Sequence, residues 1–144
     1  MASIKWGRVV AGGLLAGLIM NVGEAILHGA LLARAGTEAY LALGRTVPAD
    51  PAYLASLVGL TFAQGIAAVW LYAAIRPRYG PGARTALRAG LAVWFFSAVY
   101  AAVYLHSGFA GVFPGNVVWP PVAWELVEFP LATLAGAVIY REAS

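Results

Sequence analysis

Four long stretches of apolar residues, separated by short polar segments, dominate the pattern along this chain of 144 residues. They cover about residues 9–32, 53–75, 86–106 and 117–140. Each stretch is close to the roughly 20 residues that an α-helix needs to cross the hydrocarbon core of a bilayer. The pattern therefore predicts an all-α fold, a transmembrane four-helix bundle that forms a single domain over residues 1–144.

The composition favours a membrane protein over a water-soluble one. Hydrophobic residues make up 62% of the chain and charged residues only 10%. A chain with so little polar surface could not cover a water-facing globule. It also has no cysteine, which excludes disulfide bonds, thiolate metal ligands and cysteine nucleophiles.

The positive charges lie mostly on one side of the predicted four-span topology. Of the nine Lys and Arg residues, only Arg34 and Arg45 fall on the other side. The positive-inside rule therefore places both termini and the turn at residues 76–84 in the cytoplasm. The net charge of +3 then reflects topology and contact with lipid headgroups, so we expect a lipid bilayer as partner and no nucleic acid. The seven residues on the cytoplasmic side are Lys5, Arg8, Arg76, Arg78, Arg84, Arg88 and Arg141.

Three carboxylates interrupt the apolar stretches. Glu24, Glu125 and Glu128 are half of the six acidic residues in the chain, and all three fall inside predicted spans. A charged side chain near the middle of a membrane helix costs ~2.5–3.5 kcal/mol on insertion scales. These carboxylates therefore need partners, water or bound protons.

Helical spacing places the three carboxylates in two stripes. At ~100° per residue, one face of the first span carries polar residues toward the outside and glycines toward the cytoplasm, and the fourth span has a similar stripe. Because small residues let helices approach closely, we expect the stripes to pack face to face or to point together into the bundle centre. The stripe of the first span is Gly13, Gly17, Asn21, Glu24 and His28, and that of the fourth is Pro121, Glu125, Glu128, Ala132, Ala135 and Gly136.

The direction of the spans brings further polar side chains to a similar depth. The first and third spans run outward and the fourth runs inward, so the end of the third span lies level with the start of the fourth. We therefore expect a polar pocket that opens toward the periplasm. Its predicted lining residues are Asn21, Glu24, His28, Gln64, His106, Glu125 and Glu128.

A cation site is the sharpest chemical interpretation of this pocket. Carboxylates and imidazoles suit a divalent transition metal, and bundle cores are a known place for such sites. The candidate metal ligands are Glu24, His28, Glu125 and Glu128, although only one helix combines Glu with His. A bound proton is the alternative cation.

Two other interpretations stay open. His28 and His106 could be axial ligands of haem or chlorophyll, with Ala102 leaving room for the ring. Alternatively, the polar residues join helices, either in a homo-oligomer or in a larger membrane complex of which this chain is an accessory subunit. Hydrogen bonds between membrane helices average only ~0.6 kcal/mol, which poorly compensates three buried carboxyl groups. That comparison favours a functional pocket.

The chain shows no motif of an enzyme. It has neither a Walker-type phosphate loop nor a spacing that supports a Ser-His-Asp triad. A reaction on a lipid or quinone, with Glu24 or Glu128 as general base, stays open without positive support, so we do not expect an enzyme. The polar residues stop near the membrane midplane, which favours a dead-end binding pocket over a conducting path.

Several short motifs lie in the predicted spans or next to them. They are "NVGE" in the first, "LALGR" after it, "AVWLYAAIRPRYGPG" in the second and its turn, "GLAVWF" in the third, and "WELVE" with "GAVIYRE" in the fourth. Together they resemble a group of small bacterial four-span membrane proteins with no established function. The resemblance implies a multi-pass protein of the bacterial inner membrane, and Glu24 and Glu128 fall within the matching motifs. We therefore expect a small inner-membrane protein that binds a cation or another small ligand in its polar pocket.

Overall fold

The computed structural model describes residues 4–109 and 112–140, and within this part of the chain the regular structure is entirely helical. Four of its helices are long and apolar enough to cross a membrane, at Trp6–Leu31, Pro51–Tyr79, Ala83–Gly108 and Gly115–Ile139. The predictions of an all-α fold and of four long apolar helices are confirmed. The elements are α1 (Trp6–Ile26), η1 (Leu27–Leu31), α2 (Ala33–Ala42), α3 (Pro51–Tyr79), α4 (Ala83–Trp94), η2 (Phe95–Val99), α5 (Tyr100–Gly108) and α6 (Gly115–Ile139), where η marks a π-helical segment.

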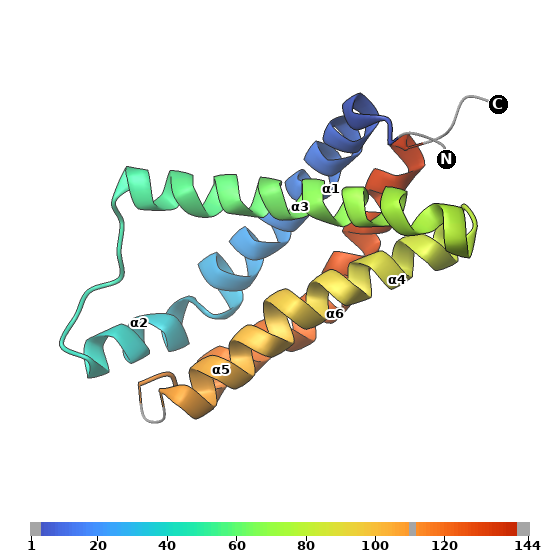
Figure 1. The fold of residues 1–144 in the computed structure, drawn as a ribbon. Helices are drawn as coiled ribbons and strands as arrows, with labels where there is room; N and C mark the ends of the chain where they lie inside the picture. The colour runs from blue at the N-terminus through green and yellow to red at the C-terminus, as the bar shows by residue number, and fades with distance from the viewer. Residues whose placement is uncertain (1–3, 110–111, 141–144) are drawn as a thin grey trace.

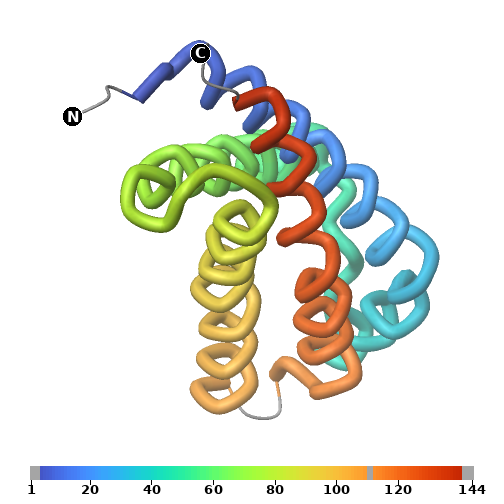
Figure 2. Tube along the Cα trace, turned by 90° about the vertical axis from the view of Figure 1, so that its right-hand side faces the viewer, coloured from blue at the N-terminus to red at the C-terminus, as the bar shows by residue number. Residues whose placement is uncertain are grey.

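The long helices pack in a ring. Helix α1 lies against α3 and α6, and α4 lies against the same two helices. The start of α1 and the end of α6 come together, where the backbone N–H of Lys5 donates to the Tyr140 hydroxyl at 3.3 Å. We call this the terminal end of the molecule, and the opposite end, which carries α2 and the start of α3, the α2 end (Figures 1 and 2).

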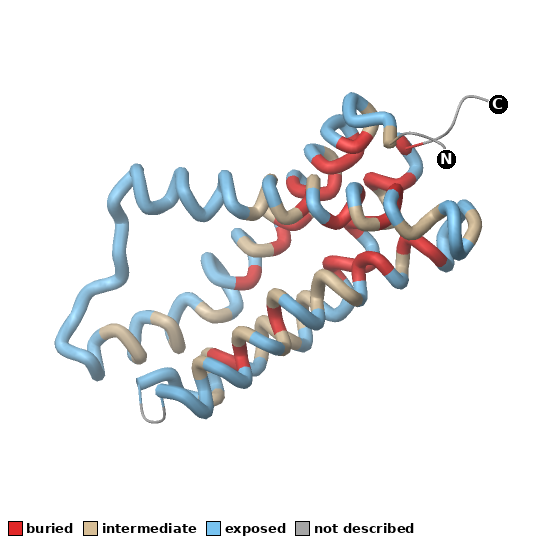
Figure 3. The backbone as a smooth tube through the Cα atoms, in the orientation of Figure 1, coloured by how far each residue is buried: buried red, intermediate tan, exposed pale blue. Residues whose placement is uncertain are grey.

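The two ends differ in how tightly the helices pack. Buried residues from α1, α3, α4 and α6 form one cluster that is concentrated toward the terminal end (Figure 3). At the α2 end, α3 diverges from α1, and every residue from 51 to 60 is exposed. The bundle is therefore closed at one end and open at the other.

Local sequence signals explain where α3 begins and how it turns into α4. The Asp50 carboxylate accepts a hydrogen bond from the Ala52 N–H at 2.7 Å, with proline at the first helical position. The helix ends at Gly80, whose φ of +81° is a conformation that favours glycine. Thr85 then fastens the turn by donating its hydroxyl to the Gly80 carbonyl at 2.8 Å.

Glycines allow α1 to approach two neighbours closely. A Cβ atom at Gly13 would overlap the Ile66 backbone, and one at Gly17 would lie 2.8 Å from the Phe62 Cα, so this face packs on α3. A Cβ at Gly12 would instead overlap the Gly136 carbonyl of α6. The structure thus differs from the predicted packing of the Gly13 and Gly17 stripe. Adjacent helix positions point about 100° apart, so neighbouring glycines serve different partner helices.

Helix α6 is held to α4 by a second close contact. A Cβ at Gly90 would lie 2.5 Å from the Pro130 Cα, so a small residue is required there. One helical turn further along α4, the Trp94 indole N–H donates to the Val122 carbonyl at 2.8 Å. These contacts fix the depth of α6 relative to its neighbours, and with it the depth of the acidic residues that α6 carries.

Candidate functional site

Glu128, the most buried carboxylate among the described residues, lies where α6 crosses α1. Glu128 is only 9% exposed, and a Cβ added to Gly23 of α1 would overlap its Oε1 atom. The same Cβ would lie 3.2 Å from the indole nitrogen of Trp124, which precedes Glu128 by one helical turn. Gly23 therefore makes the space that the Glu128 carboxyl group occupies.

Polar groups surround this carboxyl group without completing its hydrogen bonds. The Glu24 carboxyl group and the Trp124 indole N–H both face Glu128. Among the described residues, however, neither oxygen of Glu128 makes a hydrogen bond of full geometry, and the same holds for Glu24 Oε1 and Trp124 Nε1. Buried polar atoms nearly always have partners, and an unsatisfied one costs about 1–3 kcal/mol. The arrangement therefore calls for a bound proton, water or ligand.

Glu24 also connects the cluster to the open side of the molecule. Its Oε2 atom lies 3.1 Å from His28 Nε2, a spacing of four residues that brings side chains together on a helix. The His28 side chain is 54% exposed, whereas that of Glu24 is 26% exposed. His28 belongs to the π-helical segment η1, a kind of irregularity that is frequent at functional sites.

Glu125 completes a cluster of three carboxyl groups. It is partly buried on α6, within electrostatic reach of both Glu24 and Glu128. In the part of the chain that the structure describes, no Lys or Arg forms a salt bridge with any of the three. We call Glu24, Glu125 and Glu128 the acidic cluster.

Asn21 makes contacts away from the acidic cluster. Its side-chain amide donates to the Gly17 carbonyl at 2.8 Å and to the Val58 carbonyl of α3 at 3.5 Å. It therefore links α1 to α3 at the level where α3 begins to diverge.

Gln64 and His106 also lie away from the acidic cluster. Gln64 lines a groove of about 440 Å³ between α3 and the α4–η2 segment, together with Phe96 and Ser97. His106 is exposed at the end of α5, with Nδ1 3.4 Å from the Phe113 carbonyl oxygen and its ring 5.7 Å from that of Trp119, centre to centre. The structure thus brings together four predicted pocket residues, the acidic cluster and His28, and gives Asn21, Gln64 and His106 other partners.

These four residues are also the predicted metal ligands. Within residues 4–109 and 112–140, no three His, Asp or Glu side chains are grouped so that they could hold a metal ion. The proposed ligation by Glu24, His28, Glu125 and Glu128 therefore stays a prediction without geometric support. Any metal would require these side chains to rearrange.

Gly23 and Trp124 are site residues that the sequence interpretation missed. Trp124 had a signal in the sequence, because it lies four positions before Glu128 and so shares its helix face. Gly23 directly precedes Glu24, but the group that requires a glycine there is the Glu128 carboxyl group of α6. The sequence of α1 alone does not show that contact.

Comparisons with known protein families, with curated proteins and with solved structures found no match for this chain. The resemblance to small bacterial four-span proteins therefore gains no support from them. Function has to be inferred from the geometry of the acidic cluster itself.

Proposed function

We propose that this chain is a multi-pass membrane protein whose acidic cluster binds a cation, either a proton or a small positively charged ligand. The observation that carries the proposal is the position of Glu128, whose buried carboxyl group faces Glu24 and Trp124 over Gly23. A carboxylate in such a place is expensive unless something neutralises it.

Mutual repulsion strengthens this expectation. Two carboxylates about 4 Å apart repel each other by about 4 kcal/mol at an effective dielectric constant of 20. The described residues supply only His28 as a nearby group that can carry positive charge. A bound proton or cation would relieve the repulsion, which makes the acidic cluster a binding site in energetic terms.

The shape of the bundle favours binding over conduction. The His28 side chain is 54% exposed, and its segment η1 leads directly into α2, at the end where α3 diverges from α1 (Figure 1). At the terminal end, α1 meets α3 and α6 with glycine in backbone contact, and the buried core fills the space between the helices. A site open to one side suits a sensor or a carrier of bound charge.

The charge distribution supports an orientation for the protein. The described residues at the terminal end include Lys5, Arg8, Arg76, Arg78 and Arg84, whereas Arg34 and Arg45 are near the α2 end. We therefore assign the terminal end to the cytoplasm of a bacterium and the acidic cluster to the half of the inner membrane nearer the periplasm.

Elemental analysis of the detergent-purified full chain would distinguish a metal from a proton. It should compare the wild type with Glu128→Gln and, as a matched control, Glu38→Gln, because Glu38 is an exposed carboxylate outside the spans. A transition metal near one equivalent that only Glu128→Gln removes would identify the cation as a metal. If the wild type holds no metal, the proposal requires a proton or an organic cation.

An accessory subunit of a larger membrane complex or homo-oligomer is the second candidate. The observation that favours it is the first third of α3, where every residue from 51 to 60 is exposed. In that case the protein should purify with a partner, and Glu128→Gln should leave the association unchanged. His106, exposed beside Trp119, would then be the histidine available to a haem or pigment of the complex.

A further inference from the structure

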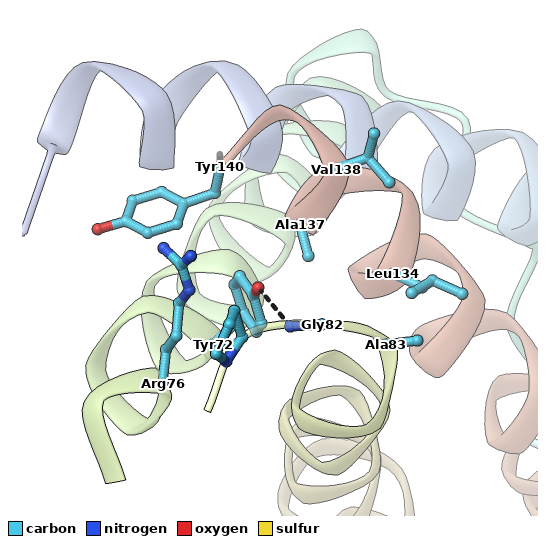
Figure 4. Close-up of a pocket in the computed structure, with 9 residues that line it drawn as sticks. Tyr72, Arg76, Gly82, Ala83, Leu134, Ala137, Val138 and Tyr140 are labelled. Atoms are coloured by element: carbon cyan, nitrogen blue, oxygen red, sulfur yellow. Dashed lines mark hydrogen bonds between the residues drawn. The ribbon is translucent and has the colours of Figure 1, made fainter. Parts of the chain in front are cut away.

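A second polar site lies at the terminal end, away from the acidic cluster. It is a pocket of about 390 Å³ between the end of α3, the turn into α4 and the end of α6. Figure 4 shows Arg76 and Tyr72 on one wall and Leu134 and Val138 on the other. The pocket is therefore amphipathic, with a cationic and an apolar wall.

The polar wall is built from aromatic rings that hold a guanidinium group. Arg76 Cζ lies 5.9 Å from the ring centre of Tyr140, and the rings of Tyr72 and Tyr140 meet edge to face at 6.0 Å. The Tyr72 hydroxyl accepts the Gly82 N–H at 3.3 Å, which leaves its own O–H to donate. Such packing fixes the guanidinium in advance, as a binding site for an anion requires.

The backbone beside the pocket adds to its positive character. Helix α4 begins at Ala83, which lines the pocket, and among the described residues no side chain caps its first turn at Gly82. The first N–H groups of a helix carry a partial positive charge.

The apolar wall indicates what kind of anion would fit. Leu134, Ala137 and Val138 of α6 line it, and Val138 is 51% exposed on the outer surface of the bundle. In a membrane, that surface faces the acyl chains. A ligand that fills the pocket would therefore meet a cation at one end and hydrocarbon at the other.

We propose that this pocket binds the phosphate group of an anionic membrane lipid, with Arg76 on the phosphate and the acyl region along Leu134 and Val138. A planar guanidinium can donate two parallel hydrogen bonds to phosphate oxygens, and juxtamembrane basic residues attract anionic headgroups. The inference rests on the proposed membrane location and is independent of cation binding by the acidic cluster.

Native mass spectrometry of the detergent-purified full chain tests the proposal. The probes are phosphatidylglycerol, phosphatidylcholine and inorganic phosphate, each titrated against the wild type. Arg76→Gln removes the cation, and Ala83→Trp fills the pocket from an exposed position on its rim. Arg45→Gln is the matched control, since it removes an exposed arginine near the other end.

We expect phosphatidylglycerol to bind more tightly than phosphatidylcholine, and both pocket variants to weaken it about tenfold, as loss of a charged hydrogen bond does. Arg45→Gln and Glu128→Gln should bind it like the wild type, so that a failure of the acidic-cluster proposal would leave this result intact. Competition by inorganic phosphate would show that the phosphate group alone is recognised, and no competition would show that the lipid chain is needed as well.

Equal binding of the two lipids by the wild type would overturn the proposal. Unchanged phosphatidylglycerol binding by the pocket variants would overturn it too. If Arg76→Gln loses its helical circular dichroism signal, that variant is not folded, and the phosphatidylglycerol binding of Ala83→Trp is the test.

Discussion

Replacing Gly23 by alanine should disturb the acidic cluster while leaving the fold nearly as stable as before. The new Cβ would lie 2.6 Å from Glu128 Cδ and 3.2 Å from Trp124 Nε1, and it would overlap Glu128 Oε1. Carbon atoms in contact prefer about 3.5–4.0 Å. The Glu128 carboxyl group would therefore have to leave its position over α1.

The magnitude follows from two opposing effects. Overpacking costs about 1–3 kcal/mol, and it falls at the low end here because the atoms that move are the end of a flexible side chain. Alanine is favoured over glycine in a helix by about 1 kcal/mol. We therefore expect the free energy of unfolding of Gly23→Ala to stay within about 1 kcal/mol of the wild type.

Gly12→Ala is the matched control on the same helix. Its Cβ would overlap the Gly136 carbonyl, a backbone atom that moves only if α1 and α6 separate. Here overpacking should outweigh helix propensity, and we expect a loss of about 1–3 kcal/mol in the free energy of unfolding. Because Gly23 lies eleven residues further along α1, about 16 Å at 1.5 Å per residue, the acidic cluster should be disturbed less than by Gly23→Ala.

The assay combines unfolding in detergent, followed by circular dichroism, with the infrared absorbance of the carboxyl groups. Gly23→Ala should change the carboxyl spectrum with little loss of stability. Gly12→Ala should lower the stability and change the carboxyl spectrum little. A carboxyl spectrum unchanged by Gly23→Ala would show that Glu128 does not lie over Gly23. A Gly12→Ala variant as stable as the wild type would refute the backbone contact between α1 and α6.

Three further substitutions test local features of the fold. Asp50→Ala removes the cap of α3 and should lower the free energy of unfolding by about 1 kcal/mol, measured by the midpoint of detergent-induced unfolding. Trp94→Phe removes the donor to the Val122 carbonyl and should cost about 1 kcal/mol from the hydrogen bond alone in the same assay, with a larger loss if the smaller ring leaves a void. The exposed pair of Arg34 and Glu38, 2.8 Å apart, should contribute little, so Arg34→Gln should leave the thermal midpoint unchanged; a clear drop would show that α2 depends on this pair.

The hydrophobic pattern predicts the long helices well because the requirement for about 20 apolar residues is strong and local. The predicted span 86–106 lies inside the observed helix of Ala83–Gly108, and the others agree to within a few residues. The irregular segment η2 in the middle of that span was not predicted. A π-helical turn depends on how a helix packs, and the apolar pattern of Phe95–Val99 carries no sign of it.

The acidic cluster could be predicted only in part, from helical spacing and from the depth of the spans. Spacing along one helix places Glu125 beside Glu128, and the depth of the spans places Glu24 near them. Which neighbour each face of α1 meets is decided by packing at Gly12, Gly13 and Gly23, and glycines on several faces of one helix leave several arrangements open.

Asn21 and Gln64 show the same limit of prediction from sequence, because both have partners outside the acidic cluster. Asn21 shares a stripe with Glu24 but bonds to the Val58 carbonyl of α3, because α3 approaches that side of α1. The sequence analysis placed Gln64 in the pocket only because of its depth in the membrane. In the structure, Gln64 lines a groove between α3 and the α4–η2 segment. Helical periodicity gives the direction of a side chain relative to its own helix, and only the arrangement of the bundle decides what it faces.

The most direct test of the central claim is infrared spectroscopy of the purified full chain at pH 7, which separates protonated from ionised carboxyl groups. The wild type should show a protonated carboxyl signal in the absence of metal, and Glu128→Gln should remove or shift it, whereas Glu38→Gln should leave it unchanged. A wild-type spectrum with only ionised carboxylates, in protein that holds neither a metal nor an organic cation, would contradict the claim that the acidic cluster binds a cation.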